Sequence, residues 1–304
     1  MIRFLVRQIA ILLFVCVAIV FLAYLGMHIL ANQAAAEIGR IAVQSPLSQA
    51  VTDTITFVGN LASGDLGTYQ SFTRTAPVTE VLIPAYANSM GLLAAAMVIA
   101  VTFGLLFGTI IALSRWEAIR FPLLTMTAIG ISVPSFLAVI LLQQIGLQFN
   151  NALGVRLISM GGFEWSFEKM LLPVLILAAR PLAYITRTVY ISLGQIMEED
   201  YIRTAYSKGL SRFRILIRHA FRNLAIPFLS ALGVSFRFSL TTLVVVEFLF
   251  GWPGIGRNLF SAITNGQTNL AVAMVLVIGL SVLIINFLLD LSYRIIDPRI
   301  RETE

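Results

Sequence analysis

Residues 9–30 read IAILLFVCVAIVFLAYLGMHIL, an apolar stretch without a single Asp, Glu, Lys or Arg. A helix of about 20 mostly apolar residues crosses the roughly 30 Å of hydrocarbon in a bilayer. Five more stretches are long and apolar enough to cross in the same way: 87–113, 123–147, 170–190, 226–250 and 271–291. The sequence therefore predicts an all-α integral membrane protein with six transmembrane helices.

The composition of the 304-residue chain agrees with a membrane location, because 58% of the residues are hydrophobic and only 12% are charged. Soluble domains carry about 25% charged residues, so too little charge remains to cover a soluble globule of this size. This excludes a water-soluble enzyme and a disordered chain. The single cysteine, Cys16, and the two histidines, His28 and His219, predict neither a disulfide framework nor a metal site. Gly104 and Gly108 form G-x-x-x-G, a pattern that favours close helix packing but is common by chance.

The first apolar stretch shares some features with a secretory signal. Arg3 and Arg7 precede it, and Ala34-Ala35-Ala36 resembles a cleavage site. Its apolar length exceeds the roughly 7–15 residues of a signal core. We therefore expect a retained transmembrane helix over 1–30, with a cleaved signal as the alternative.

The positions of the basic residues predict the orientation of the chain. With the N-terminus in the cytoplasm, 13 of the 21 Lys and Arg residues lie inside, 5 lie outside and 3 lie within spans. Those outside are Arg40, Arg74, Arg156, Lys169 and Arg257, and those within spans are Arg180, Arg187 and Arg237. We therefore expect both termini in the cytoplasm, an external segment over 31–85 and a cytoplasmic tail over 292–304. In the external segment, Gly64-Asp65-Leu66-Gly67 predicts a turn.

The predicted cytoplasmic loop over 191–225 carries the strongest functional signal. Glu198-Glu199-Asp200 places acids where the positive end of a helix dipole favours them, and a short helix follows over 201–208. Gly209 is the preferred residue type for a left-handed helix end. Ser211 is a favoured N-cap for a second helix.

The second helix of this loop is amphipathic. Its predicted apolar face comprises Phe213, Leu216, Ile217, Ala220, Phe221 and Leu224, and a basic stripe beside it comprises Arg214, Arg218 and Arg222. Pro227 then marks the entry to the fifth span. Physical chemistry alone favours two interpretations equally: the helix lies on anionic lipid headgroups, or the helix–Gly–helix corner docks into a cleft on a soluble partner.

Several short motifs in this loop and elsewhere occur together. In the loop they are Asp200-Tyr201-Ile202-Arg203-Thr204-Ala205, Lys208-Gly209-Leu210, Arg218-His219-Ala220, Arg222-Asn223 and Ile226-Pro227. Elsewhere they are Gly64-Asp65-Leu66-Gly67, Val133-Pro134-Ser135-Phe136, Glu247, Phe250, Pro253-Gly254-Ile255-Gly256, Asp290 and Asp297-Pro298-Arg299. With them, most of the chain resembles the ABC importer permeases of the dipeptide/oligopeptide/nickel family, the binding-protein-dependent transport inner membrane components.

The resemblance implies a type I ABC importer permease bundle over 86–291 with a cytoplasmic helix-Gly-helix coupling loop. It implies a subunit of an ATP-driven importer that forms half of the translocation path for peptides or a similar small solute, in the cytoplasmic membrane of a bacterium or archaeon. The implied partners are a second permease subunit, either related or identical, two ABC ATPases, an external solute-binding protein and lipid, but no nucleic acid. The residues implied for ATPase coupling, within 198–224, are Asp200, Tyr201, Arg203, Thr204, Ala205, Lys208, Gly209, Leu210, Arg214 and Arg218.

The chain is expected to hold no catalytic site, metal or cofactor of its own. It lacks the G-x-x-x-x-G-K-[ST] phosphate loop, so ATP and Mg are expected on the partner ATPases. Gly251, Gly254 and Gly256 are expected instead to form an external turn that Pro253 makes rigid.

Five residues in the spans are candidates to line the translocation path: Pro134, Ser135, Arg180, Arg237 and Glu247. An arginine near mid-membrane costs about 2.5–3.5 kcal/mol on insertion scales, so Arg180 and Arg237 are expected to face a cavity or a partner. Two roles remain open for them, contact with a substrate carboxylate or hydrogen bonds between helices.

Two functions of other classes remain as alternatives, an ion-coupled secondary transporter and a membrane scaffold that recruits a soluble partner. Secondary transporters usually place carboxylates or broken helices at mid-membrane. Glu247 and Asp290 lie near span ends, which disfavours that class. The residues leave open which solute is carried and whether the second permease is a copy of this chain.

Overall fold

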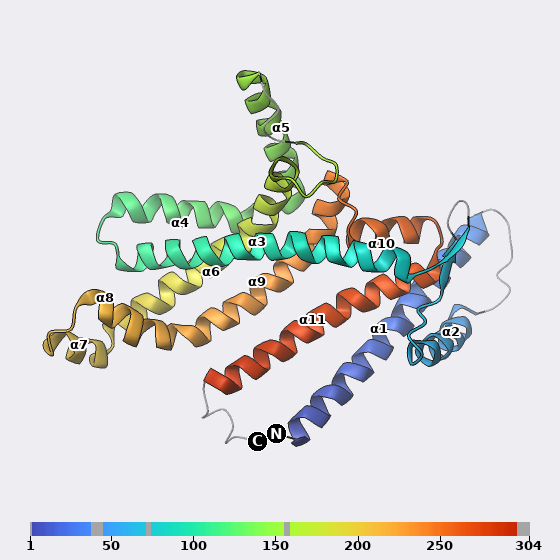
Figure 1. Ribbon diagram of the computed structural model, residues 1–304, viewed down its shortest axis with the longest axis horizontal. Helices are drawn as coiled ribbons and strands as arrows, with labels where there is room; N and C mark the ends of the chain where they lie inside the picture. Colours follow the sequence, from blue (N-terminus) through green and yellow to red (C-terminus); the bar gives the residue numbers. More distant parts are fainter. Residues whose placement is uncertain (1, 38–44, 71–73, 155–158, 297–304) are drawn as a thin grey trace. The chain divides into compact units, whose positions relative to one another are not determined.

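The computed structural model describes residues 2–37, 45–70, 74–154 and 159–296 (Figure 1). These residues belong to two compact units, which are described separately. Unit 1 comprises Met1–Ser89 and Pro253–Phe287, and unit 2 comprises Met90–Trp252 and Leu288–Glu304. Arg40, Arg156 and the predicted motif Asp297-Pro298-Arg299 lie outside the described residues.

Helices dominate the described chain. In chain order, the elements are α1 (Ile2–Glu37), α2 (Pro46–Leu61), β1 (Thr68–Gln70), β2 (Thr75–Pro77), α3 (Thr79–Leu113), α4 (Glu117–Ser132), α5 (Ser135–Leu153), α6 (Phe167–Glu198), α7 (Asp200–Ser207), α8 (Arg212–Ile215), the π-helix η1 (Leu216–Ala220), α9 (Phe221–Phe250), α10 (Ile255–Thr264) and α11 (Thr268–Ile296).

Among the described residues, six helical segments are long and apolar enough to cross a membrane, as the sequence predicts. They are Val6–Glu37, Thr79–Leu113, Ser135–Leu153, Phe167–Glu198, Arg212–Phe250 and Thr268–Ile295. The chain is therefore a multi-pass membrane protein of the all-α class.

The third predicted span is not the single helix expected over 123–147. α4 ends at Ser132 and α5 begins at Ser135, and the two helices run in different directions (Figure 1). Pro134 has no N–H with which to continue α4, and Val133 before it takes an extended backbone with φ −75° and ψ 123°. The crossing segment is consequently Ser135–Leu153, and the chain bends inside what the sequence presents as one apolar stretch.

In unit 1, α1 packs against α2, and both contribute to one hydrophobic core with α10 and α11. Val20 and Tyr24 from α1 and Phe57 from α2 are buried in this core. α2 begins after Ser45, whose hydroxyl oxygen accepts a hydrogen bond from the N–H of Ser48 at 3.3 Å. This contact satisfies one of the free amides at the start of the helix.

The predicted turn after α2 is confirmed. Gly64 and Gly67 adopt φ of +79° and +82°, which side chains disfavour. A carboxylate oxygen of Asp65 accepts a hydrogen bond from the N–H of Gly67 at 2.8 Å. The turn leads into β1, which pairs with β2 in an antiparallel hairpin that sets Tyr69 opposite Ala76.

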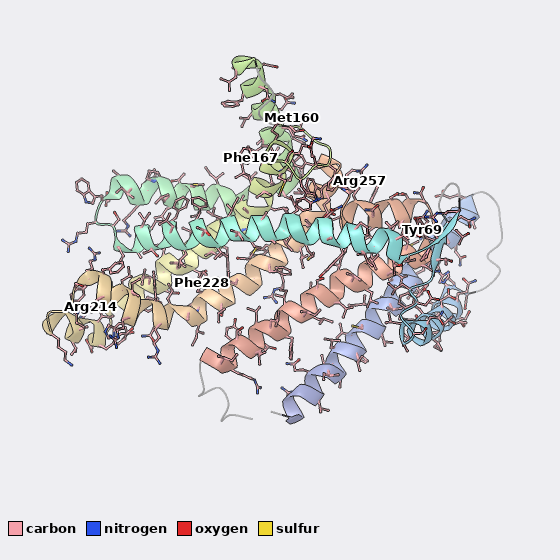
Figure 2. The ribbon with its side chains drawn as sticks, viewed as in Figure 1. Tyr69, Met160, Phe167, Arg214, Phe228 and Arg257 are labelled. Carbon is pink, nitrogen blue, oxygen red and sulfur yellow. The ribbon has the colours of Figure 1, made fainter. Side chains whose placement is uncertain are left out.

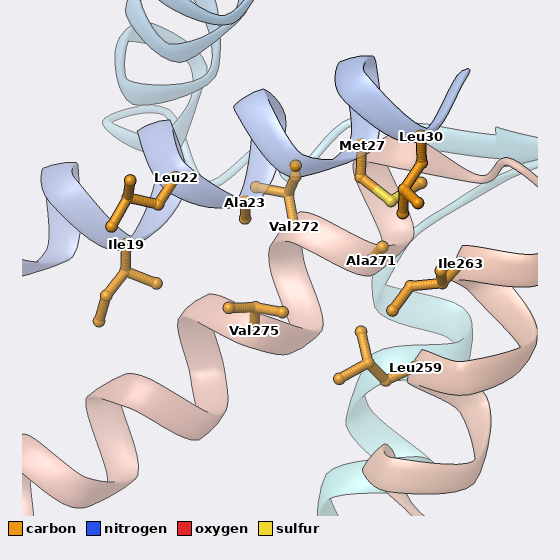
Figure 3. Close-up of a pocket in the computed structure, with 11 residues that line it drawn as sticks. Ile19, Leu22, Ala23, Met27, Leu30, Leu259, Ile263, Ala271, Val272 and Val275 are labelled. Atoms are coloured by element: carbon orange, nitrogen blue, oxygen red, sulfur yellow. The ribbon is translucent and has the colours of Figure 1, made fainter. Parts of the chain in front are cut away.

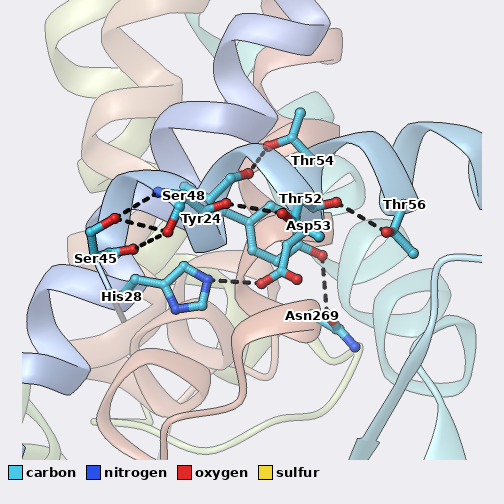
Figure 4. Close-up of polar contacts among 10 residues, drawn as sticks. Tyr24, His28, Ser45, Ser48, Thr52, Asp53, Thr54, Thr56 and Asn269 are labelled. Carbon is cyan, nitrogen blue, oxygen red and sulfur yellow. Dashed lines mark hydrogen bonds and ion pairs between the residues drawn. The ribbon is translucent and has the colours of Figure 1, made fainter. Parts of the chain in front are cut away.

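Polar side chains from distant parts of the sequence join α2 and β1 to α1 and α11 in unit 1 (Figure 4). His28 Nε2 lies 2.8 Å from a carboxylate oxygen of Asp53, and the hydroxyl of Tyr24 donates to the side-chain oxygen Oδ1 of Asn269 at 3.1 Å. The amide of Asn269 donates in turn to the carbonyl of Thr68 at 3.3 Å. The sequence predicts no partner for His28, because Asp53 is 25 residues away on another helix.

Another face of α1 lines an apolar groove of about 410 Å³ together with α10 and α11 (Figure 3). Ile19, Ala23 and Met27 recur at a spacing of four residues along this face. Tyr24 and His28 lie on the face toward α2. α1 therefore separates an apolar side from a polar one within a helix that reads as uniformly hydrophobic.

In unit 2, α6 packs against α4, α5 and α9. A side-chain carbon built on Gly104 would lie 2.8 Å from Ile185 Cγ2, and one on Gly108 would lie 2.6 Å from Val189 Cβ. Both distances are too short for a real side chain, so these glycines allow α3 to approach α6 closely. The predicted packing role of the G-x-x-x-G pattern is confirmed.

The end of α9 is fixed by a glycine turn and an aromatic cluster. Gly251 adopts φ +68°, and the N–H of Trp252 donates to the carbonyl of Glu247 at 2.9 Å. The ring of buried Trp252 packs edge-on against Phe163 and Trp165, with centroids 4.9 and 5.3 Å apart. The predicted turn is therefore present at its start, whereas Gly256 already lies within α10.

Candidate functional site

The first candidate site is the corner, defined here as residues 198–224 around α7, Gly209 and α8. α7 covers Asp200–Ser207, close to the predicted helix over 201–208. Asp200 lies in its first turn, where the helix dipole favours an acid. Arg203 contacts Asp200 at 3.3 Å, but both side chains are largely exposed, so this pair contributes little to stability.

Gly209 ends α7 in the left-handed conformation that its residue type predicts, with φ +77°. The N–H of Gly209 donates to the carbonyl of Tyr206 at 2.9 Å, and the N–H of Leu210 donates to that of Ala205 at 3.3 Å. These are the two hydrogen bonds of a Schellman motif, and Leu210 packs against the cluster that contains Ala205, a contact that often accompanies this motif. The turn at the corner is therefore specified by its own sequence.

The corner also has a small hydrophobic core of its own. Ile202 and Ile215 are completely buried, Ala205 is nearly so, and Met197 and Leu210 pack against them. α7 and α8 are thereby held together across the Gly209 turn. Fixed geometry of this kind is what a projecting element needs if it is to transmit a displacement.

The helix after Gly209 differs from the prediction. Ser211 occupies the N-cap position, but its hydroxyl makes no capping bond. α8 has only four residues, η1 follows, and the chain continues without interruption into α9, so Pro227 lies inside a helix rather than at its entry. The second helix is therefore the first part of the long segment Arg212–Phe250.

The π-helix η1 also changes which residues are buried. Ile215, Ala220 and Leu224 face inward, at spacings of five and then four residues, whereas Phe213 is 75% exposed and Ile217 is 50% exposed. The prediction placed Phe213 and Ile217 on one apolar face with Ala220 and Leu224, because it assumed 3.6 residues per turn throughout. One extra residue in η1 rotates the face, which the apolar pattern did not reveal.

The outer surface of the corner combines aromatic and basic side chains. Tyr201 and Tyr206 are 40% and 43% exposed. The hydroxyl of Tyr201 accepts a hydrogen bond from the Asn223 amide at 2.6 Å, which ties α7 to α9. Arg214, Arg218 and Arg222 are exposed as predicted, and so are Arg203, Thr204 and Lys208. Arg214 lies at the corner in Figure 2.

The second candidate site is a cavity of about 270 Å³ beside the α4–α5 break. Ser135 and Arg180 line it, together with Thr242 and apolar side chains. Arg180 donates to the carbonyl of Ile131 at 3.3 Å, and its guanidinium carbon lies 5.5 Å from the centre of the Phe238 ring. Pro134 forms the N-cap of α5 at this break. The structure thus brings together three of the five predicted path residues.

The other two residues predicted for the path lie elsewhere. Arg237 is exposed on α9, and Glu247 is completely buried near the end of the same helix. Glu247 has no exposed surface, so its side chain does not line a cavity or an outer face of this chain. Among the described residues, no group of three or more His, Cys, Asp or Glu side chains is placed to hold a metal ion.

Residues 104–302 match the family model described as the binding-protein-dependent transport system inner membrane component. The chain is 33% identical over 284 residues to the di/tripeptide transport system permease protein DppB of Pseudomonas aeruginosa, an alignment that covers 86% of this chain and 83% of the relative. It is 34% identical to the dipeptide transport system permease protein DppB of Bacillus subtilis, over 74% of this chain and 71% of the relative. It is also 34% identical to the glutathione transport system permease protein GsiC of Pectobacterium atrosepticum, over 81% and 78%.

Proposed function

Because the chain belongs to the family of binding-protein-dependent transport system inner membrane components, we propose that it imports peptides or a similar small solute as one half of a translocation path. The relatives support this cargo, since they are named for di/tripeptides, dipeptides and glutathione. All three cargoes are short, with peptide bonds and free carboxylates. The six crossing helices and the lack of a phosphate-loop motif in the sequence fit a non-catalytic membrane subunit.

In this proposal, the subunit works with a second permease, two ABC ATPases and an external solute-binding protein, and ATP and Mg bind to the ATPases. Both termini and the corner lie in the cytoplasm, in agreement with the distribution of basic residues. The permease domain takes in 86–291 after the first helix over 1–30 and the external segment over 31–85, and a tail over 292–304 follows it. The second permease is a related chain or a copy.

We assign coupling to the ATPase to the corner. This assignment rests on one observation: the corner combines a fixed interior with an exposed aromatic and basic surface. Ile202 and Ile215 fix the interior, and Tyr206 and Phe213 project from it. An aromatic ring at the centre of an interface and arginines around it are typical of protein contacts with high binding energy.

The mechanism is mechanical rather than chemical. Closure of the ATPase pair on ATP displaces the docked corner, and the crossing helices move between inward-open and outward-open states. Nucleotide biases this two-state equilibrium from one side of the membrane, and the loaded binding protein biases it from the other. α9 continues from the corner without interruption, so displacement of the corner passes directly into a crossing helix.

Gly209→Val tests the coupling assignment. Its φ of +77° is strained for any residue with a side chain, by about 1–2 kcal/mol and more for a β-branched one. A side-chain carbon there meets no described residue within 4 Å, so within this chain the change acts through the backbone. We expect normal membrane insertion, but at least a fivefold loss of ATPase copurification and of ATP-driven uptake.

Two matched variants make this test specific. Gly194 lies in helix α6 close to the corner, and a side-chain carbon there also meets nothing within 4 Å, so Gly194→Val is expected to keep the ATPase. Gly209→Asn is expected to recover most of the binding, because Asn tolerates the left-handed region. Wild-type copurification with Gly209→Val would contradict the coupling role. Reconstitution that binds the ATPase but accumulates no solute with ATP would favour a scaffold instead.

A further inference from the structure

The cavity beside the α4–α5 break contains a positive charge in an otherwise apolar lining. Its polar lining residues are Ser135, Arg180 and Thr242, and the others are apolar or glycine, among them Leu141 and Ile176. α5, α6 and α9 all contribute to the wall, and each belongs to a segment able to cross the membrane. An arginine in such a segment is costly unless it meets a partner or a water-filled cavity.

The described partners of Arg180 engage only part of its hydrogen-bonding capacity. The guanidinium has five N–H donors, and among the described residues it makes one hydrogen bond, to the carbonyl of Ile131 at 3.3 Å. That carbonyl is available because the helix breaks at Val133 and Pro134. The face of Phe238 adds a cation–π contact at 5.5 Å. Among the described residues, no carboxylate lies within ion-pair distance of Arg180.

The chemistry of the cavity therefore calls for an anion from outside the chain. A carboxylate accepts two parallel N–H bonds from a guanidinium, which is the strongest arrangement available to either group. Ser135 offers a hydroxyl donor in the same cavity, and α5 begins at this residue, so the positive end of its dipole adds to the potential. Leu141 and Ile176 supply apolar surface next to the charge.

We propose that Arg180 binds the terminal carboxylate of the transported solute in this cavity, while the apolar wall receives the side chain of its last residue. This inference rests on the proposed import of peptides. The cavity of about 270 Å³ is slightly smaller than the pockets of roughly 300–1,000 Å³ that enclose drug-sized ligands, so it takes one end of a peptide. Arg180 would thereby require a free carboxylate after the binding protein has released its cargo.

The test compares a dipeptide with its C-terminal amide in the reconstituted importer, with ATPases and binding protein at saturating concentrations. Arg180→Gln is expected to lower uptake of the free acid about tenfold or more relative to wild type, and uptake of the amide less than about twofold. Arg180→Lys keeps the charge and is expected to recover part of the free-acid uptake. Arg187→Gln removes an exposed arginine two turns along the same helix and is expected to change neither.

A second measurement avoids the selectivity of the binding protein. The purified complex without it is heated in nanodiscs with millimolar dipeptide or its amide. The free acid is expected to raise the midpoint temperature of thermal unfolding of the wild-type complex but not that of the Arg180→Gln complex. The amide is expected to raise neither midpoint.

Several results would overturn the proposal. One is an equal loss of acid and amide uptake in Arg180→Gln, which would leave Arg180 as a cap for the end of α4. Another is equal thermal stabilisation of wild type and Arg180→Gln, or stabilisation of neither by the free acid. Absence of peptide uptake by the wild-type complex would instead contradict the proposed function, and the thermal measurement would still decide whether Arg180 binds a carboxylate.

Discussion

The corner of unit 2 and the 46–77 segment of unit 1 are both short, polar parts of a hydrophobic chain, but they are stabilised in different ways. In the corner, the bond from Leu210 to Ala205 and the contact between Ile202 and Ile215 join residues that are near in sequence. In the 46–77 segment, the carbonyl of Thr68 accepts a hydrogen bond from the side chain of Asn269, which is 201 positions away in the sequence. The interior of the corner is held by contacts within 197–224, and one exposed hydrogen bond, from Arg212 to the carbonyl of Leu113 at 2.9 Å, reaches outside it. The 46–77 segment instead depends on α1 and α11.

The two regions are expected to respond differently to a perturbation. A corner with a core of its own is expected to keep its shape when the surrounding helices move, which the proposed coupling role requires. The 46–77 segment instead follows α1 and the start of α11, because Asp53 and Thr68 are bonded to them. Substitutions that weaken each kind of contact are expected to separate the two behaviours.

The largest effect is expected from Ile202→Ala. Ile202 is completely buried in the small core of the corner, and removal of a buried Ile side chain costs about 2–5 kcal/mol. Hydrogen exchange of the amides in 199–215 is expected to accelerate about 30-fold or more, with no change in the 46–77 segment. Copurification of the ATPase with the Ile202→Ala variant is expected to decrease, because the corner loses its fixed shape.

Ile217→Ala is the matched control for this substitution. Ile217 is 50% exposed, so loss of its side chain leaves the small core intact and amide exchange nearly unchanged. Rapid exchange spreading from Ile202→Ala into the 46–77 segment would contradict the local specification of the corner.

A smaller effect is expected from the contact between His28 and Asp53. The atoms are 2.8 Å apart, but the Asp53 side chain is 44% exposed, so solvent screens much of the interaction. A double-mutant cycle with His28→Ala and Asp53→Ala is expected to give a coupling free energy of about 0.5–1.5 kcal/mol, measured by exchange of the α2 amides. The same cycle should leave the corner unaffected, and an additive cycle would show that α2 is positioned by apolar packing alone.

The same distinction explains which features the sequence predicts. Gly209, the acids before α7 and the turn at Gly64–Gly67 act through their own backbone or the residues beside them, and all three are found where expected. The partner of His28 was not predicted, because nothing near it in sequence marks Asp53. The unbroken apolar pattern of α1 conceals its polar face for the same reason.

Helix breaks show that even a local rule can be insufficient. Pro134 and Pro227 each follow a β-branched residue, Val133 and Ile226. α4 ends before Pro134, yet Pro227 lies inside α9. Both prolines lack the same N–H, so the outcome depends on what the surrounding helices supply. For the second candidate site, the sequence predicted Arg180 and Ser135 as path residues. It did not predict that the two line one cavity, because that depends on the helix break at Val133 and Pro134.

The smallest effect is expected from the ion pair that joins the end of the 46–77 segment to the first turn of α3. Arg74 lies 2.7 Å from Glu80, but the two side chains are 65% and 44% exposed. Exposed pairs typically contribute about 0.2–1 kcal/mol, and salt screens them further. A double-mutant cycle with Arg74→Ala and Glu80→Ala is expected to give a smaller coupling free energy than the His28 and Asp53 cycle, and one that decreases at high salt. If the exposed pair proved stronger than the pair between α1 and α2, the segment would be stabilised locally, as the corner is, and the contrast between the two regions would fail.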